Sequence, residues 1–384
     1  MKSYWPQKIY VDESARDDEL VARFRARLPQ AEFEYVASGT DPLAADSIGE
    51  PRSAAEVAAR FARGKRELVL TRYRGSWLKG CPGTSGHVCC NLYIVNPGEG
   101  CPLDCTYCYL QAYLRRNPTL KLYTNTNEML AAIAERAESE PRRLFRIGTG
   151  EVIDSLVWDD LTDFTLDVVP FFARHPNLVL ELKTKTTNIA NLLSLRDAHG
   201  GNTVVSWSVN AAPVSEHDEA LTASLDDRLR AAADVAEAGY RVGFHFDPVV
   251  HFEGWQDAYR EAVKKVLSSV DSSRIAWVSV SSLRYKPEMQ QIMEERFPTS
   301  KLPYGEQFLA KDGKLRYIQP LRMQLVGFVW NEIRALYPQI PVYMCMESSA
   351  AWRNIAGGPP AAGSELVEIF SRRRQYVDDA SRTL

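Results

Sequence analysis

The sequence lacks long apolar runs and a strong charge of one sign. No stretch approaches the roughly 18 consecutive apolar residues that a membrane-spanning helix needs. The N-terminal segment MKSYWPQKIYVDE also lacks the apolar core of a secretory signal peptide. The net charge is only -3, so the chain as a whole is not a polyelectrolyte, although a local basic face could still bind nucleic acid. We expect a cytoplasmic protein with no membrane partner.

Cysteine is scarce and unevenly placed. The chain has seven cysteines, and this odd number argues against a framework of disulfide bonds. Thiols stay reduced in the cytoplasm, where cysteines more often bind metals or take part in catalysis. Internal repeats and low-complexity tracts are also missing. The length of 384 residues indicates more than one ordinary domain, or one barrel-sized domain with an appendage.

The first 80 residues predict a small α/β lobe. Apolar patterning indicates three strands separated by two helices, and Ser53 is positioned to cap the second helix. The predicted strands cover 7–13, 32–37 and 67–75, the helices cover 17–28 and 53–65, and a loop covers about 38–52. We expect this lobe at residues 1–80 and a barrel unit with a C-terminal extension at residues 81–384.

From about residue 91, strands and helices alternate regularly. The predicted strands are 91–97, 143–150, 177–185, 202–211, 240–250, 274–283 and 340–346. The predicted helices are 125–139, 161–175, 188–195, 224–239, 255–270, 288–297 and 324–338. Repeated strand–helix units imply parallel strands with right-handed crossovers, so we predict an α/β barrel or open half-barrel. Active sites of such barrels lie at the carboxyl ends of the strands.

Three cysteines follow the first strand of this series at close spacing. Cys101, Cys105 and Cys108 form a C-x3-C-x2-C motif, in which the aromatic Tyr107 precedes the third cysteine. Thiolates are the soft ligands of iron–sulfur clusters, and three of them leave one iron of a [4Fe–4S] cluster open. That iron can bind the amino and carboxylate groups of S-adenosylmethionine (SAM), and an electron from the cluster can then cleave the sulfonium.

A zinc site is the alternative interpretation of these cysteines. Structural zinc usually takes four ligands in two closely spaced pairs, and no second Cys or His pair lies near the motif. Cys81, Cys89 and Cys90 precede the motif and could ligate a second metal.

At these residues the sequence resembles the radical SAM superfamily, whose signature is C-x3-C-x-aromatic-C. Within it, four segments in the same order along the chain resemble the spore photoproduct lyase family. They are PQKIYVDE (6–13), CTYCYLQAYL (105–114), DDRLRAAADVAEAGYRVGF (226–244) and EGWQDAY (253–259). The resemblance implies a partial (β/α)6 TIM-type radical SAM barrel behind the small N-terminal α/β lobe.

The resemblance also implies an activity and its partners. That family repairs a thymine photodimer in DNA as a carbon–carbon lyase, by reductive cleavage of SAM to a 5′-deoxyadenosyl radical that abstracts hydrogen from the substrate. The implied cofactors are a [4Fe–4S] cluster and SAM. The implied electron donor is a reduced flavodoxin or a ferredoxin-type protein.

Several site residues follow from the resemblance, residue by residue. Cys101, Cys105 and Cys108 are the implied cluster ligands. Tyr109 corresponds to a tyrosine beside SAM and in a radical relay, and Tyr107 corresponds to an aromatic near the substrate, so both are candidate catalytic residues. The implied SAM contacts include Lys185, Ser208 and Asn210.

Lys185, Ser208 and the two tyrosines could instead have purely structural roles. Lys185 could be a surface lysine that extends its ammonium to solvent. Ser208 could satisfy nearby backbone, and the two tyrosines could be packing aromatics.

The sequence departs from the family at the hydrogen-atom donor. The family places a cysteine just after the second barrel strand, but this sequence has Gly148 there and no cysteine between Cys108 and Cys345. The same segment instead resembles the glycine-rich SAM-binding motif of radical SAM enzymes, and its alternative is an ordinary strand-to-helix turn. Its glycines would let backbone approach the methionine amino group, and its acid would help hold that cation. The motif residues are Gly148, Thr149, Gly150 and Glu151.

Two other residues are candidates for the missing donor. Cys345 lies at the end of the last predicted strand, where a thiol can face the central cavity. Its alternative is a buried apolar cysteine, the commonest state of a free thiol. Tyr109 is the other candidate.

The segment 300–320 corresponds to a basic hairpin that opens the DNA duplex in the family, and it looks shorter here. It keeps basic side chains and an aromatic one that could hold phosphate and stack a base. These residues are Lys311, Lys314, Arg316 and Tyr317, and we expect Arg284, Arg316 and Tyr317 to bind substrate. A solvated turn at Asp312 and Gly313 explains the segment equally well.

Three functional hypotheses remain open at this point. The first is a lyase of the spore photoproduct family acting on DNA or a nucleotide. The second is a relative that acts on a non-DNA substrate, such as a free nucleoside or a peptide. The third is a metal-bearing nucleic-acid-binding protein without catalysis.

Overall fold

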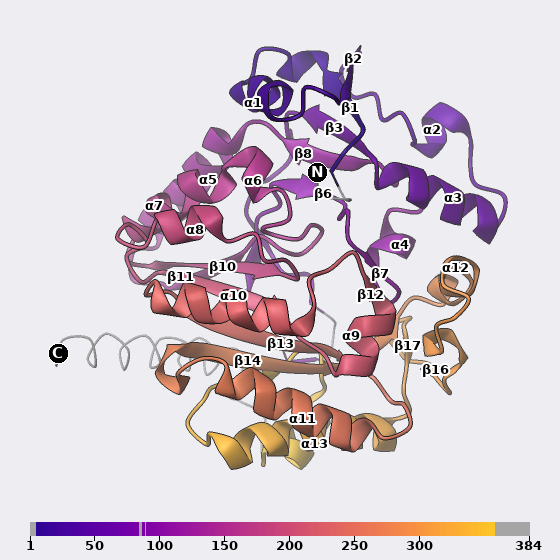
Figure 1. Ribbon diagram of the computed structural model, residues 1–384, viewed down its shortest axis with the longest axis vertical. Helices are drawn as coiled ribbons and strands as arrows, with labels where there is room; N and C mark the ends of the chain where they lie inside the picture. The colour runs from indigo at the N-terminus through magenta and orange to yellow at the C-terminus, as the bar shows by residue number, and fades with distance from the viewer. Residues whose placement is uncertain (1–4, 84–86, 89, 358–384) are drawn as a thin grey trace.

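The computed structural model describes residues 5–83, 87–88 and 90–357. Figure 1 shows a small sheet from the N-terminal part of the chain above a larger curled sheet, with α11 (Trp255–Ser268) and α13 (Gln319–Leu336) below it. None of the helices in these ranges is both long enough and apolar enough to cross a membrane. Cys89 lies outside the described residues, so the predicted second metal site cannot be placed.

The small sheet is mostly parallel and has five strands within the described residues. Its spatial order is β2 (Glu32–Val36), β1 (Lys8–Asp12), β3 (Glu67–Thr71), β8 (Leu120–Tyr123) and β6 (Gly98–Glu99), with β6 antiparallel. The connecting helices are η1 (Glu13–Ala15), α1 (Glu19–Arg27), α2 (Ala45–Ile48) and α3 (Ala54–Gly64). Two strands of this sheet come from beyond residue 80. The division at residues 1–80 and 81–384 stays a prediction.

The larger sheet follows the order of the chain, as a barrel does. Its order in the described part is β18 (Val342–Met344), β14 (Ile275–Ser282), β13 (Arg241–Val249), β11 (Thr203–Ser208), β10 (Leu178–Thr184), β9 (Phe145–Gly148), β5 (Tyr93–Ile94) and β4 (Lys79–Gly80). All neighbours pair in parallel except β4 with β5. The predicted α/β half-barrel is therefore confirmed.

Helices and short strands complete the barrel and its rim. The helices are α4 (Leu110–Tyr113), α5 (Thr126–Ser139), α6 (Asp159–Thr162), α7 (Phe164–Ala173), α8 (Ala190–Ser194), α9 (Ala212–Asp218), α10 (Leu225–Glu237), η2 (Ser272–Arg274), α12 (Glu288–Arg296), η3 (Leu302–Tyr304) and α14 (Ser349–Ala356). The short strands are β7 (Asp104–Cys105), β12 (Glu219–Ala220), β15 (Arg284–Tyr285), β16 (Phe308–Leu309) and β17 (Leu315–Arg316). In Figure 1 the labels β7, β12, β16 and β17 all lie on the right of the view.

Local sequence explains the well-predicted elements. The strand β10 is an almost uninterrupted buried run, as expected for a parallel strand covered on both faces. Ser53 and Ser224 cap α3 and α10 by accepting hydrogen bonds from the backbone N–H three residues on, at 3.2 and 3.1 Å. The small and large sheets each carry their own cluster of buried apolar side chains.

Tertiary contacts changed several predicted elements. The helix predicted at 161–175 is split into α6 and α7, because Asp163 adopts a left-handed conformation with φ of 55°. Arg27 holds the Asp163 carboxylate through two hydrogen bonds of 2.9 and 2.7 Å, which fixes that turn. The predicted loop at 38–52 contains α2, and the strand predicted at 91–97 is paired only at Tyr93–Ile94. Short elements such as β8, α9 and α14 were not predicted.

Candidate functional site

The three motif cysteines lie in a loop that neighbouring elements hold from several sides. Gly100 precedes the first cysteine with φ of +87°, and a Cβ there would lie 2.7 Å from Leu120, so the turn requires glycine. Lys65 donates hydrogen bonds to the carbonyl of Cys101 at 2.9 Å and to that of Leu103 at 2.5 Å. Arg296 binds both carboxylate oxygens of Asp104 at 2.8 Å.

The donor set fits an iron–sulfur cluster. Cys105 is buried and Cys101 and Cys108 are partly buried, and all three thiols are free. Burial raises the pKa of Cys105 to about 12 and raises the pKa of Cys101 as well. These thiols therefore stay protonated until a metal displaces the protons. Within the described ranges, no three His, Cys, Asp or Glu side chains are arranged to hold a single metal ion. Cluster thiolates each bind a different iron and need no shared point.

Lys185 joins the cysteine loop to the end of β10. Its Nζ lies 3.8 Å from the Cys105 sulfur, 2.7 Å from the Tyr107 hydroxyl and 3.4 Å from a carboxylate oxygen of Glu219. The Lys185 side chain is only 12% exposed, which excludes the surface-lysine alternative. Burial lowers the Lys185 pKa, but electrostatic interactions with Cys105 and Glu219 outweigh burial and raise the pKa above its ordinary value.

Glu219 is the buried counter-ion of this arrangement. Arg228 forms an ion pair with it at 2.7 Å, and the Tyr107 hydroxyl donates a hydrogen bond to it. The strand β12 carries Glu219 and pairs with β7, which brings its backbone directly opposite Cys105. Burial raises the Glu219 pKa, yet Lys185 and Arg228 outweigh it and hold the pKa below its ordinary value. No sequence motif pointed to Glu219 or Arg228, because their role depends on this strand pairing.

The glycine-rich turn lies between β9 and the cysteine loop. Gly148 ends β9, and a Cβ on Gly150 would lie within 3.2 Å of Lys183 and Ser155, so larger residues do not fit there without a shift. The Tyr109 hydroxyl donates to the carbonyl of Glu151, which ties the third cysteine's neighbour to this turn. Thr149 is buried and donates to Ser155 at 2.8 Å.

A layer of polar side chains crosses the inside of the barrel. Glu181 on β10 is its centre, and one carboxylate oxygen receives Arg146 at 2.6 Å while the other accepts from Ser206 at 2.9 Å and Trp277 at 3.0 Å. His245 lies 2.9 Å from the same oxygen as Ser206 and Trp277. The full layer, one or more residues from each of six strands, is Arg146, Glu181, Ser206, His245, Trp277, Ser279 and Tyr343.

A second layer lies one step nearer the carboxyl ends of the strands. Side chains two residues apart on a strand point to the same face, so each strand places a further residue above the Glu181 layer. These residues are Gly148, Lys183, Ser208, Asp247, Ser281 and Cys345. Three of them, Gly148, Ser208 and Cys345, were predicted site residues. We call this set the upper layer.

Arg284 lies beside two members of the upper layer, Asp247 and Cys345. Arg284 pairs with Asp247 at 3.2 Å and contacts the sulfur of Met346 at 3.3 Å. Burial raises the pKa of Cys345 to about 12, while the Arg284 charge opposes that rise. The Cys345 thiol therefore stays protonated at the barrel mouth, as a hydrogen-atom donor must. Its predicted catalytic role and that of Arg284 in substrate binding remain predictions.

The other predicted residues have different surroundings. Asn210 is buried, and its amide donates to the Pro248 carbonyl at 2.9 Å while its oxygen accepts from the Tyr259 hydroxyl at 2.7 Å. This favours a structural role for Asn210. The Ser208 carbonyl accepts from Arg228 at 2.9 Å, in line with the backbone alternative, while its side chain stays at the strand end.

Arg316 and Tyr317 are held inside the protein. Arg316 is 2% exposed and pairs with Asp312 at 2.5 Å. The Tyr317 hydroxyl is buried and accepts from the His251 backbone at 3.1 Å. Their placement argues against direct contact with a substrate, contrary to the sequence-based expectation. This pairing was not predicted, because Asp312 was interpreted as part of a solvated turn.

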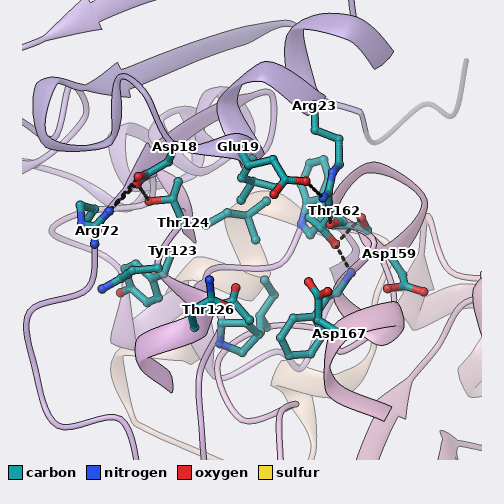
Figure 2. A pocket seen from close by; sticks show the side chains of 18 of the residues that line it. Asp18, Glu19, Arg23, Arg72, Tyr123, Thr124, Thr126, Asp159, Thr162 and Asp167 are labelled. Carbon is teal, nitrogen blue, oxygen red and sulfur yellow. Dashed lines mark hydrogen bonds and ion pairs between the residues drawn. The ribbon is translucent and has the colours of Figure 1, made fainter. Parts of the chain in front are cut away.

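A cavity of about 300 Å³ lies at the carboxyl edge of the small sheet, and none of the predicted site residues lines it. Figure 2 shows Asp18 between Arg72 and Thr124, and Arg23 beside Glu19. Its wall also includes Asp154, whose carboxylate accepts from the Lys185 backbone N–H at 2.8 Å. The charged groups of Figure 2 mostly pair with one another.

Comparison with known families identifies close relatives by sequence. The family model described as spore photoproduct lyase matches residues 4–333. A spore photoproduct lyase of Geobacillus sp. (strain Y412MC61) is 30% identical over 217 residues, which cover 56% of this chain and 63% of that protein. The enzyme of that name from Clostridium acetobutylicum is 25% identical over 252 residues, covering 66% of this chain and 72% of that protein.

Solved structures give the same picture of the fold. A spore photoproduct lyase mutant with bound AdoMet and dinucleoside spore photoproduct has a TM-score of 0.76 at 24% identity, covering 88% of this chain and 98% of that one. Spore photoproduct lyase complexed with the dinucleoside alone has a TM-score of 0.75 at 23% identity. At these identities the structural likeness establishes the shared fold. The aligned region spans just under two thirds of the Geobacillus protein's length.

Proposed function

Because the chain belongs to the spore photoproduct lyase family, we propose that it is a radical SAM enzyme that repairs a thymine photoproduct in DNA. The observation that carries the proposal is the position of Lys185, whose ammonium links the cysteine loop to a strand end of the half-barrel. A structural zinc loop has no need of a buried cation at its thiol. A reduced cluster gains from one, because the positive charge offsets its added electron.

The residues present fit the two cofactors of the family. Cys101, Cys105 and Cys108 would hold a [4Fe–4S] cluster, and the turn at 148–151 with Lys185 would hold the methionine part of SAM. When bound, these groups supply a 5′-deoxyadenosyl radical that takes a hydrogen atom from the substrate. The chain itself binds and orients these groups and keeps water away. A reduced flavodoxin or ferredoxin-type protein is the proposed electron source.

Cys345 is the proposed donor of the hydrogen atom that ends the repair. In this step its S–H bond breaks, a C–H bond forms on the product, and a sulfur radical remains on the protein. The sulfur radical would then have to regain a hydrogen atom, which 5′-deoxyadenosine would supply. Its support is the upper layer, in which Cys345 is the one cysteine among the side chains that strand alternation directs into the described barrel interior.

The hairpin of β16 and β17 favours a nucleic acid over a free nucleoside. Phe308 is 51% exposed and Leu309 is 58% exposed. Both lie on β16 of this antiparallel hairpin, whose connecting turn contains Gly313 with a positive φ. Apolar side chains displayed in this way serve as wedges or stacking surfaces for bases. A free nucleoside would leave these side chains without a partner.

Anaerobic reconstitution tests the proposal. The purified protein should bind on the order of one [4Fe–4S] cluster per chain. When it is given reductant, SAM and a spore photoproduct dinucleotide, it should release 5′-deoxyadenosine or repaired thymine. A protein that loads iron, binds DNA and never cleaves SAM would instead be the non-catalytic binding protein. A protein that cleaves SAM but leaves both dinucleotide and duplex photoproducts intact would support the non-DNA relative.

A further inference from the structure

Around the upper layer, basic side chains outnumber the acids with which they pair. Three ion pairs lie around the barrel mouth, Arg284 with Asp247 at 3.2 Å, Arg316 with Asp312 at 2.5 Å and Arg322 with Glu347 at 3.1 Å. Each acid therefore already has an arginine partner.

Two lysines near these ion pairs have no carboxylate partner within the described residues. Within the described residues the ammonium groups of Lys183 and Lys314 make no hydrogen bond or ion pair. Burial lowers the pKa of Lys314, and the charge of Arg284 adds to this effect. The surroundings of Lys314 are therefore already positive.

Lys183 faces the inside of the barrel. It lies two residues after Glu181, whose carboxylate is fixed in the interior by Arg146 and His245, so it projects from the same face of β10. Its charge lies near Asp247, which already pairs with Arg284, and near the Cys345 thiol. At both groups burial raises the pKa, and the Lys183 charge opposes that rise. Lys183 therefore lies in the same upper layer as Cys345, the proposed hydrogen-atom donor.

A partly buried ammonium without a counter-ion is costly, and a bound anion relieves that cost. We infer that Lys183, assisted by Lys314, forms an anion-binding site at the barrel mouth for a singly charged oxyanion, either a phosphodiester of the substrate or a carboxylate of SAM. This inference deepens the proposed function and rests on it for the identity of the ligand. Both sources present oxygens that accept a charge-assisted hydrogen bond.

The experiment compares the reconstituted holoenzyme with K183Q, K314Q and K183R. The control is K264Q, because Lys264 is exposed on the outer face of α11. Three ligands are titrated under anaerobic conditions: SAM, a photoproduct dinucleotide with its bridging phosphate, and the dinucleoside without it. Inorganic phosphate, followed by its effect on thermal unfolding, probes the site without either cofactor or substrate. Circular dichroism and urea unfolding verify that each variant folds.

If the anion is the phosphodiester, K183Q weakens dinucleotide binding roughly tenfold or more and leaves dinucleoside and SAM binding unchanged. If the anion is the SAM carboxylate, K183Q weakens SAM binding by a similar factor and both photoproducts bind as before. In either case K183R restores most of the loss, K314Q has a smaller effect, and phosphate stabilises wild type and K264Q more than K183Q.

The inference is overturned if folded K183Q matches wild type for all three ligands and for phosphate. Failure of the proposed function is a separate result. A wild-type protein that never cleaves SAM removes the proposed function, while loss of phosphate stabilisation in K183Q would still support the anion site. If the wild type cleaves SAM and K183Q binds every ligand as the wild type does, the proposed function is supported and the anion-binding site is refuted.

Discussion

The ammonium group of Lys185 lies 3.8 Å from the thiol sulfur of Cys105. Glu219 lies on its other side at 3.4 Å, and Arg228 in turn holds Glu219 at 2.7 Å. The lysine predicted to contact SAM thus also lies beside Cys105, a proposed cluster ligand. We therefore expect its charge to link SAM binding to the electronic state of the cluster.

The substitution K185M should lower the midpoint potential of the reconstituted cluster. A nearby positive charge favours the reduced state, so its loss should shift the potential down by roughly 60 mV, a tenfold change in a one-electron equilibrium. E219Q should shift it upward, because it removes a negative charge from the same place. Redox titration followed by electron paramagnetic resonance measures both.

Iron content and the K264Q variant serve as controls for that experiment. K185M should still bind iron, since the three thiols are intact, and K264Q should keep the wild-type potential. Equal potentials for wild type, K185M and E219Q would contradict this account of Lys185.

The substitution E181A should destabilise the fold strongly. It leaves the Arg146 guanidinium, whose side chain is 6% exposed, without its carboxylate, and breaking a buried pair costs about 3–5 kcal/mol. The exposed pair of Asp226 and Lys265 is the matched control, because D226A should cost no more than about 1 kcal/mol. Urea unfolding measures both, and similar losses for the two variants would refute the buried-pair argument.

Stability should fall as the pH is lowered through the titration of His245. Burial holds the pKa of this histidine below its ordinary value of 6.5, so the unfolded chain binds a proton before the folded one does. The stabilising contribution is complete above pH 6.5 and is lost progressively as the pH falls towards the folded pKa. Protonation of Glu181 should also lower the free energy of unfolding, but at a lower pH. Burial raises its pKa, but Arg146 and His245 outweigh burial and hold the pKa well below the ordinary 4.5.

Urea unfolding between about pH 7.5 and 5.5 tests this dependence, with a slope of up to about 1.4 kcal/mol per pH unit from one proton. H245Q should reduce that slope, leaving the part that comes from His199, whose pKa burial also lowers. H217Q, on the exposed face of α9, should keep the full slope. An unchanged slope in H245Q would assign the acid sensitivity to another group.

The substitution C345S should separate hydrogen abstraction from product formation. A thiol exchanges its hydrogen with solvent, so a wild-type reaction in D₂O should place one deuterium on the repaired thymine. The O–H bond of serine is a poorer hydrogen-atom donor, so C345S should still bind SAM while its repaired product falls by at least roughly tenfold. Mass spectrometry of the product measures both. Full deuterium incorporation by C345S would point to another donor, with Tyr109 first.

The double substitution F308S/L309S should weaken binding of duplex DNA but not of a dinucleotide. Base–aromatic stacking is worth about 1–3 kcal/mol, so the loss for DNA should be roughly 5- to 150-fold. K311Q on the same turn should instead reduce the salt dependence of binding with a smaller loss of affinity. Fluorescence anisotropy measures these affinities. Equal binding of duplex DNA by wild type and the double variant would favour the smaller substrate.

Much of the architecture was predictable because local patterns encode it. The buried run of β10, the serine caps of α3 and α10, and the regular strand–helix alternation all lie within short stretches of chain. The family resemblance, carried by motifs spread along the sequence, is confirmed by the family model over residues 4–333. Asp163 broke a predicted helix because a distant arginine on α1 holds it, which no local pattern reveals.

The sequence by itself determined the strand and helix types, the cysteine spacing and the glycine-rich turn, because each depends on neighbours within a few residues. Only the tertiary structure decided which charges meet. In the part of the chain that the structure describes, it buried Arg316 against Asp312, set Glu219 beside Lys185 and left the Lys183 ammonium without an ion pair. Such pairings depend on the register between strands and on how the half-barrel curls, and these are set by packing of the whole chain.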